Sequence, residues 1–375
     1  MLKKKVLFVA TVSGHINAFH LPYIEWMSNE GYIVDVACDV HSKIEGNVNK
    51  VHDIKIARSP FTIKHINAYK ELKEVIDNGL YDLITCHTPM ASVLARLASR
   101  EARRKGTKVL YTAHGFHFFK GGPLLNWLVF YPIERYLTNF TDGLVCINQP
   151  DYDIISKKGN QKCDYFKIPG IGVREDRYFP VLNCEEKILI RKEKNFSTTK
   201  FLGIYAAEFI PRKNHFFILN AFKQEKNRLN DVQILFAGRG ELEEELKIFV
   251  QKNGLEKNIS FIGFRRDLDE VFRSCDFGIS ASKQEGLPIN IVEEMLSGLP
   301  IIASIERGHL ELVRNSENGF LFNLDSSREL VDSIIKLKDS GDFLVNSGKK
   351  SRVIGEEYRL ENSMKSMIAI FRKYL

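Results

Sequence analysis

Short apolar runs recur along this chain, and stretches with helical periodicity separate them. In the first half the runs cover residues 6–10, 33–37, 83–86, 108–112 and 143–147. In the second half they cover residues 202–206, 233–237, 259–262, 277–280 and 301–303. The runs are apolar nearly throughout, as strands buried on both faces must be, and helical patterns such as 68–76 and 90–104 lie between them. Strands that alternate with helices predict parallel sheets with right-handed crossovers.

The length of 375 residues exceeds one ordinary hydrophobic core and predicts two domains. We expect an α/β protein with two Rossmann-like, doubly wound parallel-sheet domains of similar size. The first is expected over residues 1–175 and the second over residues 176–355, because the stretch 170–200 is charged and irregular. Residues 356–375 are predicted to form a terminal helix with an apolar stripe, and the sequence leaves open which domain it packs on.

The composition, 44% hydrophobic and 27% charged, is typical of a soluble globular protein. The basic and then apolar N-terminus reads as a buried first strand rather than a signal peptide, because the apolar run is short and no small-residue cleavage site follows it. No run is long enough to span a bilayer. The six cysteines are scattered without a C-x-x-C pair, which favours a reduced, cytoplasmic protein.

The net charge of +7 permits contact with an anionic ligand or an anionic membrane surface but requires neither. The chain contains no nucleic-acid-binding module, dinucleotide fingerprint, phosphate-binding P-loop or H-E-x-x-H zinc motif, so we do not expect nucleic acid as a partner. Two Asp-x-Asp patterns, Asp151 with Asp153 and Asp267 with Asp269, stand where helices are predicted to begin. Helix capping explains them better than metal binding does. We therefore expect no metal and no cofactor.

The segment 282–304 is the most informative part of the sequence. It leaves an apolar strand, passes through a Gly-Pro loop, becomes helical and re-enters a strand. Glu285 lies in the loop and Glu293 on the helix, with seven residues between them. Two carboxylates and a loop of N–H groups at the carboxyl end of a strand can hold a polar, phosphorylated ligand. The alternative is a pair of ordinary surface glutamates.

Other strand ends carry glycine, histidine or basic residues. Ligands of open α/β sheets bind at the carboxyl ends of the strands. In the first half these ends carry Gly14, His15, His87, His114 and His117, and in the second half Arg212, Lys213, Gly238, Arg239 and Arg265. If the two edges face each other, the cleft between the domains carries phosphate-binding and polar groups.

Each of these residues also has a structural explanation. Gly14 could make a tight turn, His87 could be a satisfied core histidine, and Arg212 with Lys213 could be a solvated surface. We favour a functional role for His114, because a glycine follows it and His117 is close by. Cations at a helix N-terminus gain nothing from the helix dipole, so an anionic ligand is a better reason for Arg212 and Lys213.

With these motifs the chain resembles the retaining glycosyltransferases of family 4, which have the GT-B fold. In that fold two Rossmann-like domains face each other across a cleft. The most specific part is Glu285-Gly-Leu-Pro followed by Glu293, supported by Asn318-Gly-Phe-Leu321 and Lys213-Asn-His215. The resemblance covers nearly the whole chain. The stretch from His87 to His117 is similar to enzymes that build bacterial exopolysaccharide and capsule repeat units.

The resemblance implies site residues and their roles. His114 would lie close to the reacting sugar, Lys213 would neutralise the diphosphate leaving group, and Glu285 would hold donor sugar hydroxyls; these three are the expected catalytic residues. The expected donor-binding residues are Gly14, Arg212, Lys213, Gly238, Arg239, Arg265, Glu285, Gly286, Leu287, Pro288 and Glu293. The acceptor-side candidates are His15, His20, His87 and His117.

The chain departs from the family pattern at one position that affects the leaving group. Many members have an arginine where this chain has Glu208, and a carboxylate cannot neutralise phosphate, so Arg212 is expected to share that task with Lys213. The reaction implied is transfer of a sugar from a nucleotide diphosphate, most readily UDP, to an acceptor hydroxyl with retained configuration. Fixed cations would stabilise the charge that grows on the leaving phosphate.

The acceptor is expected to be a glycan or a polyprenyl-diphosphate-linked sugar. The stretch 116–131 is aromatic and apolar and suits a membrane interface, and Arg96, Arg100, Arg103, Arg104 and Lys105 lie near it. This places the protein in the cytoplasm, at the inner face of the membrane. Core packing for the apolar stretch and solvation for the arginines remain the alternative.

Two other functions fit the same fold. A nucleotide-sugar 2-epimerase needs no acceptor, and a non-catalytic nucleotide-sugar-binding subunit needs no turnover. Glu208 in place of arginine hints at the latter, whereas retention of Lys213 and Glu285 argues against it.

Overall fold

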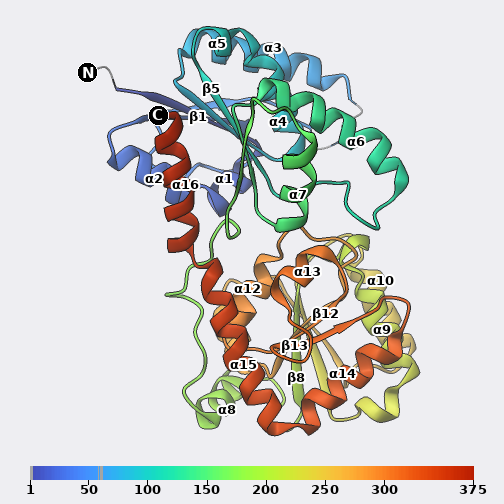
Figure 1. Ribbon diagram of the computed structural model, residues 1–375. Helices are drawn as coiled ribbons and strands as arrows, with labels where there is room; N and C mark the ends of the chain where they lie inside the picture. Colours follow the sequence, from blue (N-terminus) through green and yellow to red (C-terminus); the bar gives the residue numbers. More distant parts are fainter. Residues whose placement is uncertain (1–2, 58, 60–61) are drawn as a thin grey trace. The chain divides into compact units, whose positions relative to one another are not determined.

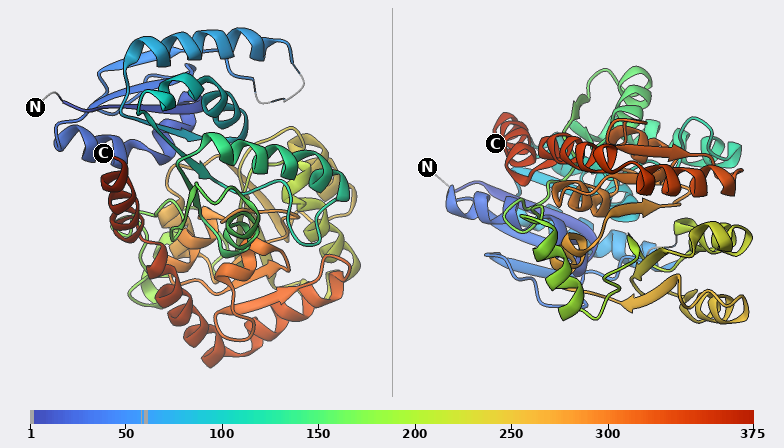
Figure 2. Two further views of the ribbon diagram at one scale, coloured as in Figure 1. Left: turned by 45° about the horizontal axis from the view of Figure 1, so that its top comes forward. Right: turned by 90° about the horizontal axis from the view of Figure 1, so that it is seen from below.

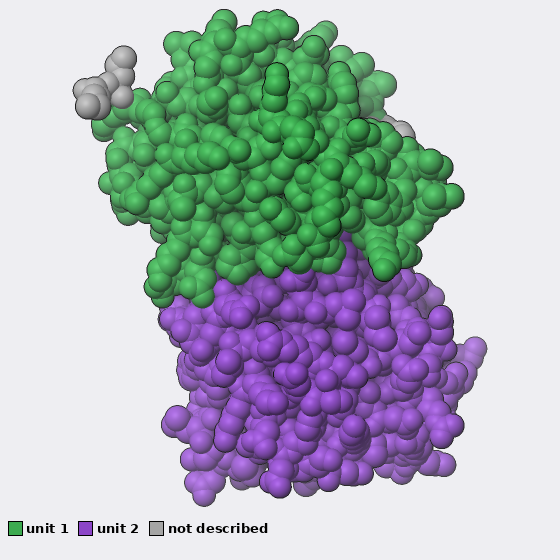
Figure 3. Space-filling view, in the orientation of Figure 1, with its two compact units in different colours: residues 1–171, 361–375 green, residues 172–360 purple. Residues whose placement is uncertain are grey.

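Two parallel sheets organise the chain in the computed structural model, which describes residues 3–57, 59 and 62–375. Unit 1 consists of Met1–Ile171 and Glu361–Leu375, and unit 2 consists of Gly172–Leu360 (Figure 3). The structure thus places the boundaries after Ile171 and Leu360, a few residues from the expected positions 175 and 355.

The sheet of unit 1 has the strand order β3-β2-β1-β4-β5-β6-β7, and every neighbouring pair is parallel. The strands are β1 Lys5–Val12, β2 Ile33–Asp39, β3 Lys50–Asp53, β4 Leu83–His87, β5 Lys108–Ala113, β6 Gly143–Cys146 and β7 Asp164–Lys167. This order winds outward in both directions from β1, which confirms the predicted doubly wound fold. The two edge strands β3 and β7 were not predicted because they are short, polar and only partly buried.

Helices flank both faces of this sheet (Figures 1 and 2). They are α1 Ser13–Phe19, α2 Leu21–Asn29, α3 Lys64–Gly79, α4 Pro89–Ala98, α5 Arg100–Arg104, α6 Leu124–Leu137, η1 Thr138–Phe140, α7 Gln149–Lys158 and α16 Leu360–Tyr374. The single helix predicted over 90–104 is divided at Ser99. The Ser99 hydroxyl donates to the Ala95 carbonyl at 2.6 Å, a bond that often bends a helix.

The C-terminal helix α16 packs within unit 1. Phe371 is fully buried and stacks on Trp26 with 6.3 Å between the ring centroids. The Tyr374 hydroxyl bonds Asp164 beside the edge strand β7 at 2.7 Å, and Ser363 donates to the Pro169 carbonyl. These contacts show that the terminal helix packs on unit 1, a choice that the sequence had left open.

The sheet of unit 2 repeats the arrangement with the order β10-β9-β8-β11-β12-β13, again all parallel. Its strands are β8 Phe201–Ala206, β9 Val232–Ala237, β10 Ile259–Gly263, β11 Phe277–Ser280, β12 Ile301–Ser304 and β13 Gly319–Phe322. The unpredicted strand β13 begins at Gly319, where a Cβ atom would lie 1.8 Å from the Ile301 carbonyl oxygen. Only glycine lets this strand approach β12.

The helices of unit 2 lie on both faces of its sheet (Figure 1). They are α8 Cys184–Glu193, η2 Pro211–Lys213, α9 His215–Gln224, η3 Lys226–Leu229, α10 Glu243–Lys252, α11 Leu268–Ser274, α12 Ile289–Leu296, α13 Arg307–Leu312, α14 Ser327–Asp339, α15 Gly341–Gly355 and η4 Glu356–Tyr358. Within the described residues, no helix has the length and apolar character needed to cross a bilayer. All six cysteines are free thiols, and Cys184 alone among them is exposed.

Candidate active site

Three strand ends of unit 2 converge on Glu285. The short helix η2 follows β8, the loop 281–288 follows β11, and α13 begins shortly after β12. These strands are neighbours in the sheet, so their carboxyl ends meet at one edge. The Lys283 amide donates to the Arg212 carbonyl at 2.9 Å, which ties the loop to η2.

Glu285 is paired with two cations in this structure. The Lys213 ammonium lies 2.5 Å from Oε1, and the Arg212 guanidinium lies 3.2 Å from Oε2. Glu285 is 7% exposed. Burial alone would raise the pKa of this carboxyl, but the Lys213 and Arg212 charges outweigh burial and lower the pKa. The structure therefore brings together three residues that the sequence predicted, as one cluster with two positive charges and one negative charge.

The loop around Glu285 is fixed by residues that the sequence reasoning did not assign. The Glu285 amide donates to Glu306 at 2.8 Å, and Arg307 Nε donates to the Glu285 carbonyl at 2.9 Å. Glu306 also accepts the His309 amide at 2.8 Å, as the N-cap of α13. Applying the strand-end rule to β12, as to the other strands, would have pointed to these residues.

Glu293 lies on α12, the helix that follows the loop. Burial raises its pKa to about 7, although the Tyr178 hydroxyl and the Arg177 guanidinium oppose the rise. Burial also raises the pKa of Glu306 to about 7. Both carboxyls therefore change charge near neutral pH, whereas Glu285 stays ionised.

The remaining donor-side candidates occupy nearby loops of unit 2. Gly238 follows β9, and a Cβ atom there would lie 2.0 Å from the Ala207 carbonyl oxygen, so the loops after β8 and β9 approach closely. The Arg239 guanidinium lies 5.1 Å from the ring centroid of Phe264. Gly286 and the buried Leu287 continue the Glu285 loop, and Pro288 stands at the N-cap position of α12.

Arg265 is held by a neighbouring carboxylate. Its guanidinium makes two bonds to Asp267, at 2.8 and 2.5 Å, and Lys194 binds the same carboxylate. Asp267 precedes α11, yet its side chain makes no capping bond, so the predicted cap is wrong there. At α7 the capping residue is Asn148 rather than Asp151, since the Asn148 side chain accepts the Asp151 amide at 2.9 Å.

Glu208, the residue that replaces the family arginine, is exposed after β8. Among the described residues no ion pair involves its carboxylate. Arg212, four residues later, points instead to Glu285 and to the Gln284 carbonyl, which it reaches at 2.7 Å. The cluster thus keeps two cations without an arginine at position 208.

The corresponding edge of unit 1 carries histidines in place of charges. His15 lies on α1 and His20 caps its end, while His87 ends β4 and His114 follows β5. The His20 and His87 rings are 3.8 Å apart, and the His15 and His114 rings are 4.9 Å apart, between centroids. Burial lowers the pKa of all four, that of His15 to about 4, so they are neutral at pH 7.

Two of the structural explanations can now be decided. Gly14 lies in the first turn of α1, and a Cβ atom there would meet no other atom within 4 Å. Neither a tight turn nor a close neighbour therefore requires this glycine. His87 is buried, and its Nε2 lies 3.2 Å from Thr85 Oγ1, but its Nδ1 has no partner among the described residues. His87 is therefore a core histidine with a hydrogen-bond partner for one of its two ring nitrogens.

A largely apolar pocket of about 900 Å³ opens beside the histidines of unit 1. Gly14, His15, Thr88 and His117 line part of it, and side chains of α4 and α6 line much of the rest. The apolar stretch predicted over 116–131 is divided between two environments. Phe116 and Phe118 are core residues, whereas three leucines of α6 are exposed: Leu124 by 73%, Leu125 by 68% and Leu128 by 67%.

The basic surface predicted near this stretch is only partly present. Arg96 is completely buried and pairs with Glu134 at 2.9 Å, because the helices α4 and α6 pack on each other. Arg103 is held by Asp142 at 2.9 Å, and Arg104 pairs with Glu101. Arg96 is therefore a structural residue and does not belong to a membrane-facing surface.

Two family patterns match this chain. That of the group 1 glycosyl transferases matches residues 186–354, and that of the 4-like glycosyl transferases matches residues 5–148. EpsD of Bacillus subtilis (strain 168), which is named as a glycosyltransferase, is 39% identical over 376 residues that cover 100% of this chain and 98% of EpsD.

This chain belongs to the group 1 glycosyltransferases.

A second relative of this glycosyltransferase carries a more specific name. It is the UDP-Gal:alpha-D-GlcNAc-diphosphoundecaprenol alpha-1,3-galactosyltransferase of Escherichia coli, which is 27% identical over 89% of this chain and 87% of its own length. Among solved structures, Anabaena HepE in complex with UDP and glucose has a TM-score of 0.79 at 21% identity, over 99% of this chain and 100% of HepE. The structural likeness shows the shared GT-B fold.

The geometry of this glycosyltransferase separates two kinds of chemistry. The edge of the unit 2 sheet offers fixed cations and a buried carboxylate, which suit a phosphorylated, hydroxyl-bearing ligand. The edge of the unit 1 sheet offers neutral imidazoles beside a largely apolar pocket.

Proposed function

We propose that this glycosyltransferase moves a sugar from a UDP-sugar to a lipid-linked glycan acceptor with retention of the anomeric configuration, in the assembly of an exopolysaccharide or capsule. The observation that carries the proposal is the cluster of Lys213, Arg212 and Glu285 at the strand ends of unit 2. A buried carboxylate between two cations is already held where a diphosphate and sugar hydroxyls can replace the ion pairs.

The donor assignment is supported by the names of the relatives. The Escherichia coli relative is named for a UDP-sugar, and HepE was solved with UDP-glucose. In our assignment Lys213 and Arg212 bind the diphosphate, Glu293 binds ribose hydroxyls, and Glu285 accepts hydrogen bonds from the donor sugar. The N–H groups from Gly286 onward approach the sugar or the phosphate. Gly238, Arg239, Arg265, Leu287 and Pro288 complete the donor site.

The proposed chemistry breaks the bond between the sugar C1 and the diphosphate oxygen. The electron pair leaves with UDP, and Lys213 and Arg212 stabilise the charge that develops on the leaving oxygen. The acceptor hydroxyl attacks C1 from the same face, and its proton passes to the leaving phosphate. In unit 1, Gly14 and His114 keep the roles that the family resemblance implies, near the phosphates and near the reacting sugar. The two side-chain cations carry out the neutralisation, so this step requires no metal.

The acceptor assignment rests on unit 1. The pocket beside His15 and His117 is largely apolar, and α6, which lines it with Val129, Phe130 and Ile133, also exposes Leu124, Leu125 and Leu128. A helix that exposes leucines beside an apolar pocket suits an acceptor that carries a hydrocarbon chain in a membrane. The diphosphoundecaprenol in the name of the Escherichia coli relative agrees with this class of acceptor. We therefore place the enzyme at the cytoplasmic face of the membrane, with α6 in the interface.

The proposal is tested in two steps with the purified full chain. Thermal shift with UDP-, GDP- and ADP-sugars identifies the donor, because a bound donor stabilises the fold. The donor is then incubated with and without undecaprenyl-diphosphate-linked sugar, and the products are examined by NMR at the anomeric carbon. We expect a new glycosidic bond of the same configuration only when the acceptor is present. An epimer formed from donor alone would indicate the 2-epimerase, and donor binding without turnover across an acceptor panel would indicate the non-catalytic subunit.

A further inference from the structure

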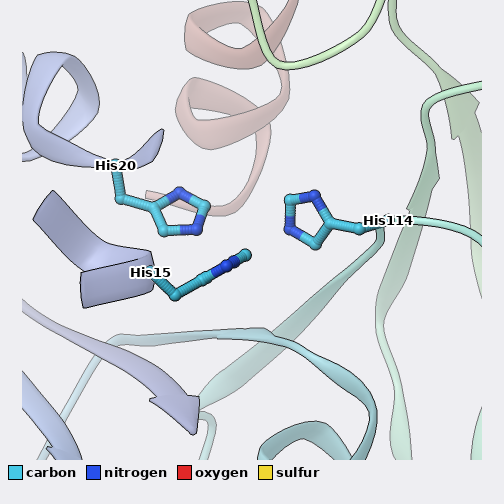
Figure 4. A group of neighbouring side chains, drawn as sticks. All are labelled: His15, His20 and His114. Carbon is cyan, nitrogen blue, oxygen red and sulfur yellow. The ribbon is translucent and has the colours of Figure 1, made fainter. Parts of the chain in front are cut away.

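The histidine cluster of unit 1 contains more nitrogen atoms than its surroundings satisfy. His15, His20 and His114 point toward one another (Figure 4). Their ligand atoms, one nitrogen from each ring, all lie within 4.8 Å of one another. His15 Nε2, His114 Nε2 and both ring nitrogens of His20 are buried without a hydrogen-bond partner in the part of the chain that the structure describes.

Packing alone is an expensive explanation for this arrangement. A buried polar atom without a partner destabilises the folded state, and most buried polar atoms in proteins have a partner. One nitrogen from each of the three rings belongs to a group within 4.8 Å, and His20 is only 1% exposed. Apolar side chains of similar size would fill the same space without this cost. The convergence therefore calls for a ligand that accepts several nitrogen lone pairs at once.

The chemistry of the three rings selects the class of ligand. Neutral imidazole is the metal-binding form of histidine, and burial keeps these rings neutral. Imidazole nitrogens suit zinc and neighbouring first-row transition metals, whereas magnesium and calcium require oxygen ligands. Zinc–nitrogen bonds of about 2.0–2.1 Å in a tetrahedron place the nitrogens roughly 3.4 Å apart. The limit of 4.8 Å on the present spacing exceeds this by about 1.4 Å, so metal binding would draw the three rings closer together.

We propose that His15, His20 and His114 form a binding site for a divalent transition metal of the zinc type. His15 also lines the apolar pocket, so a fourth ligand would reach the metal from that pocket. Three protein ligands with one open position are the pattern of zinc sites that accept an exchangeable ligand. The His87 ring, which is bonded to Thr85, lies against the His20 ring with 3.8 Å between the centroids and limits its movement.

This site goes beyond the proposed function and departs from the expectation, drawn from the sequence, that the chain binds no metal. It shares His114 with the proposed active site, but its test does not require glycosyl transfer. The cations that neutralise the leaving diphosphate belong to unit 2, whereas the metal would be bound by unit 1. Metal binding can be measured without donor or acceptor, so a failure of either proposal leaves the other standing.

The test is a titration of the metal-free full chain with Co²⁺, followed by its visible absorption and by calorimetry. We expect one Co²⁺ per chain, the ligand-field bands of a tetrahedral or five-coordinate nitrogen site, and displacement by Zn²⁺ but not by Mg²⁺. The variants His15→Ala, His20→Ala and His114→Ala should each weaken binding by at least about tenfold. His41→Ala, which removes an exposed histidine beside Asp39, should bind like the wild type.

The design separates metal binding from damage to the fold. His20→Phe fills the same space, and circular dichroism checks that it folds. A folded His20→Phe chain that has lost the ligand-field bands supports the site. Absence of stoichiometric Co²⁺ binding in the wild type would overturn the proposal whatever the variants do. Unchanged binding in folded His20→Phe would overturn it as well.

Discussion

Apart from the extra edge strand β7 of unit 1, the two units have the same strand order, yet different chemistry gathers at the carboxyl ends of their strands. In unit 2 the edge carries Lys213 and Arg212 paired with the ionised Glu285. In unit 1 it carries neutral histidines with unsatisfied nitrogens beside an apolar pocket. In both units the topology brings the strand ends together at one edge, and the side chains at those ends determine which class of ligand each edge suits.

The charged edge is organised before a ligand arrives. Each member of the cluster has a partner, and Glu306 and Arg307 fix the loop backbone around Glu285. A site of this kind binds a phosphorylated ligand by exchanging one set of ionic contacts for another. Within the described residues, the histidines of this edge form no ion pairs, so the edge gains most from a ligand that satisfies nitrogen atoms or apolar surface.

The largest expected effect concerns Lys213. Lys213→Ala should lower kcat by roughly 10²–10³-fold, because one of two groups that stabilise the leaving phosphate is lost. Lys252→Ala, which removes an exposed lysine at the end of α10, is the matched control and should keep full activity. Steady-state release of UDP in the presence of acceptor measures both. Equal rates in Lys213→Ala and the control would remove the catalytic assignment.

The pH dependence of donor binding tests Glu293. Its pKa is raised to about 7, so it becomes ionised between pH 6 and 8, and the ionised carboxylate accepts stronger hydrogen bonds from ribose hydroxyls than the protonated form does. Affinity for a UDP-sugar should therefore rise about tenfold from pH 6 to pH 8. Glu293→Gln should flatten this dependence in calorimetric titrations.

The raised pKa of Glu293 has the opposite effect on the free energy of unfolding, which should fall rather than rise with pH. A carboxyl with a raised pKa holds its proton more tightly in the folded state, so its contribution is full below pH 4.5 and is lost as pH rises through 7. Stability that falls less with pH in Glu293→Gln than in the wild type would agree. A binding profile that stays steep in Glu293→Gln would assign the titration to Glu306 instead.

The exposed leucines of α6 are predicted to contact the membrane. Replacing Leu124, Leu125 and Leu128 by serine should reduce co-sedimentation with liposomes about tenfold, because the apolar side chains no longer enter the interface. The control replaces the exposed Leu182 and Ile248 of unit 2 by serine and should bind as the wild type does. Equal losses in both variants would show that general surface hydrophobicity, rather than α6, drives the binding.

The smallest effect is expected at position 208. Glu208→Arg restores the cation found in many family members, but Arg212 already supplies a second positive charge to the cluster. We expect UDP affinity to improve by only about 2–5-fold, as for one partly solvated charge. A gain near a hundredfold would mean that Arg212 does not share the task.

Much of the fold follows from the sequence, because buried parallel strands must be apolar throughout. All ten predicted strands are present, and the strand-end rule located Lys213, Glu285 and the histidines. The edge strands β3 and β7 were missed because each has only four residues, is partly exposed and has a charged residue at both ends.

Long-range contacts account for the other differences. Arg96 looked like a surface residue, since its partner Glu134 lies 38 positions away and only the packing of α4 on α6 brings the two together. The capping role of Asn148 depends on where α7 begins, within one or two residues. The convergence of His15, His20 and His114 joins two strand ends, so spacing along the chain could not reveal it.

The central claim is that the charged side chains of unit 2, and not the histidine side chains of unit 1, supply the binding energy for the nucleotide diphosphate. Calorimetric titration of UDP into the wild type, Lys213→Ala and His114→Gln at pH 8 tests it directly. The account predicts that Lys213→Ala weakens UDP binding by at least about tenfold, as expected for the loss of one partner of a charged hydrogen bond, while His114→Gln stays within about twofold of the wild type. Unchanged UDP affinity in folded Lys213→Ala, with a loss in His114→Gln, would contradict it.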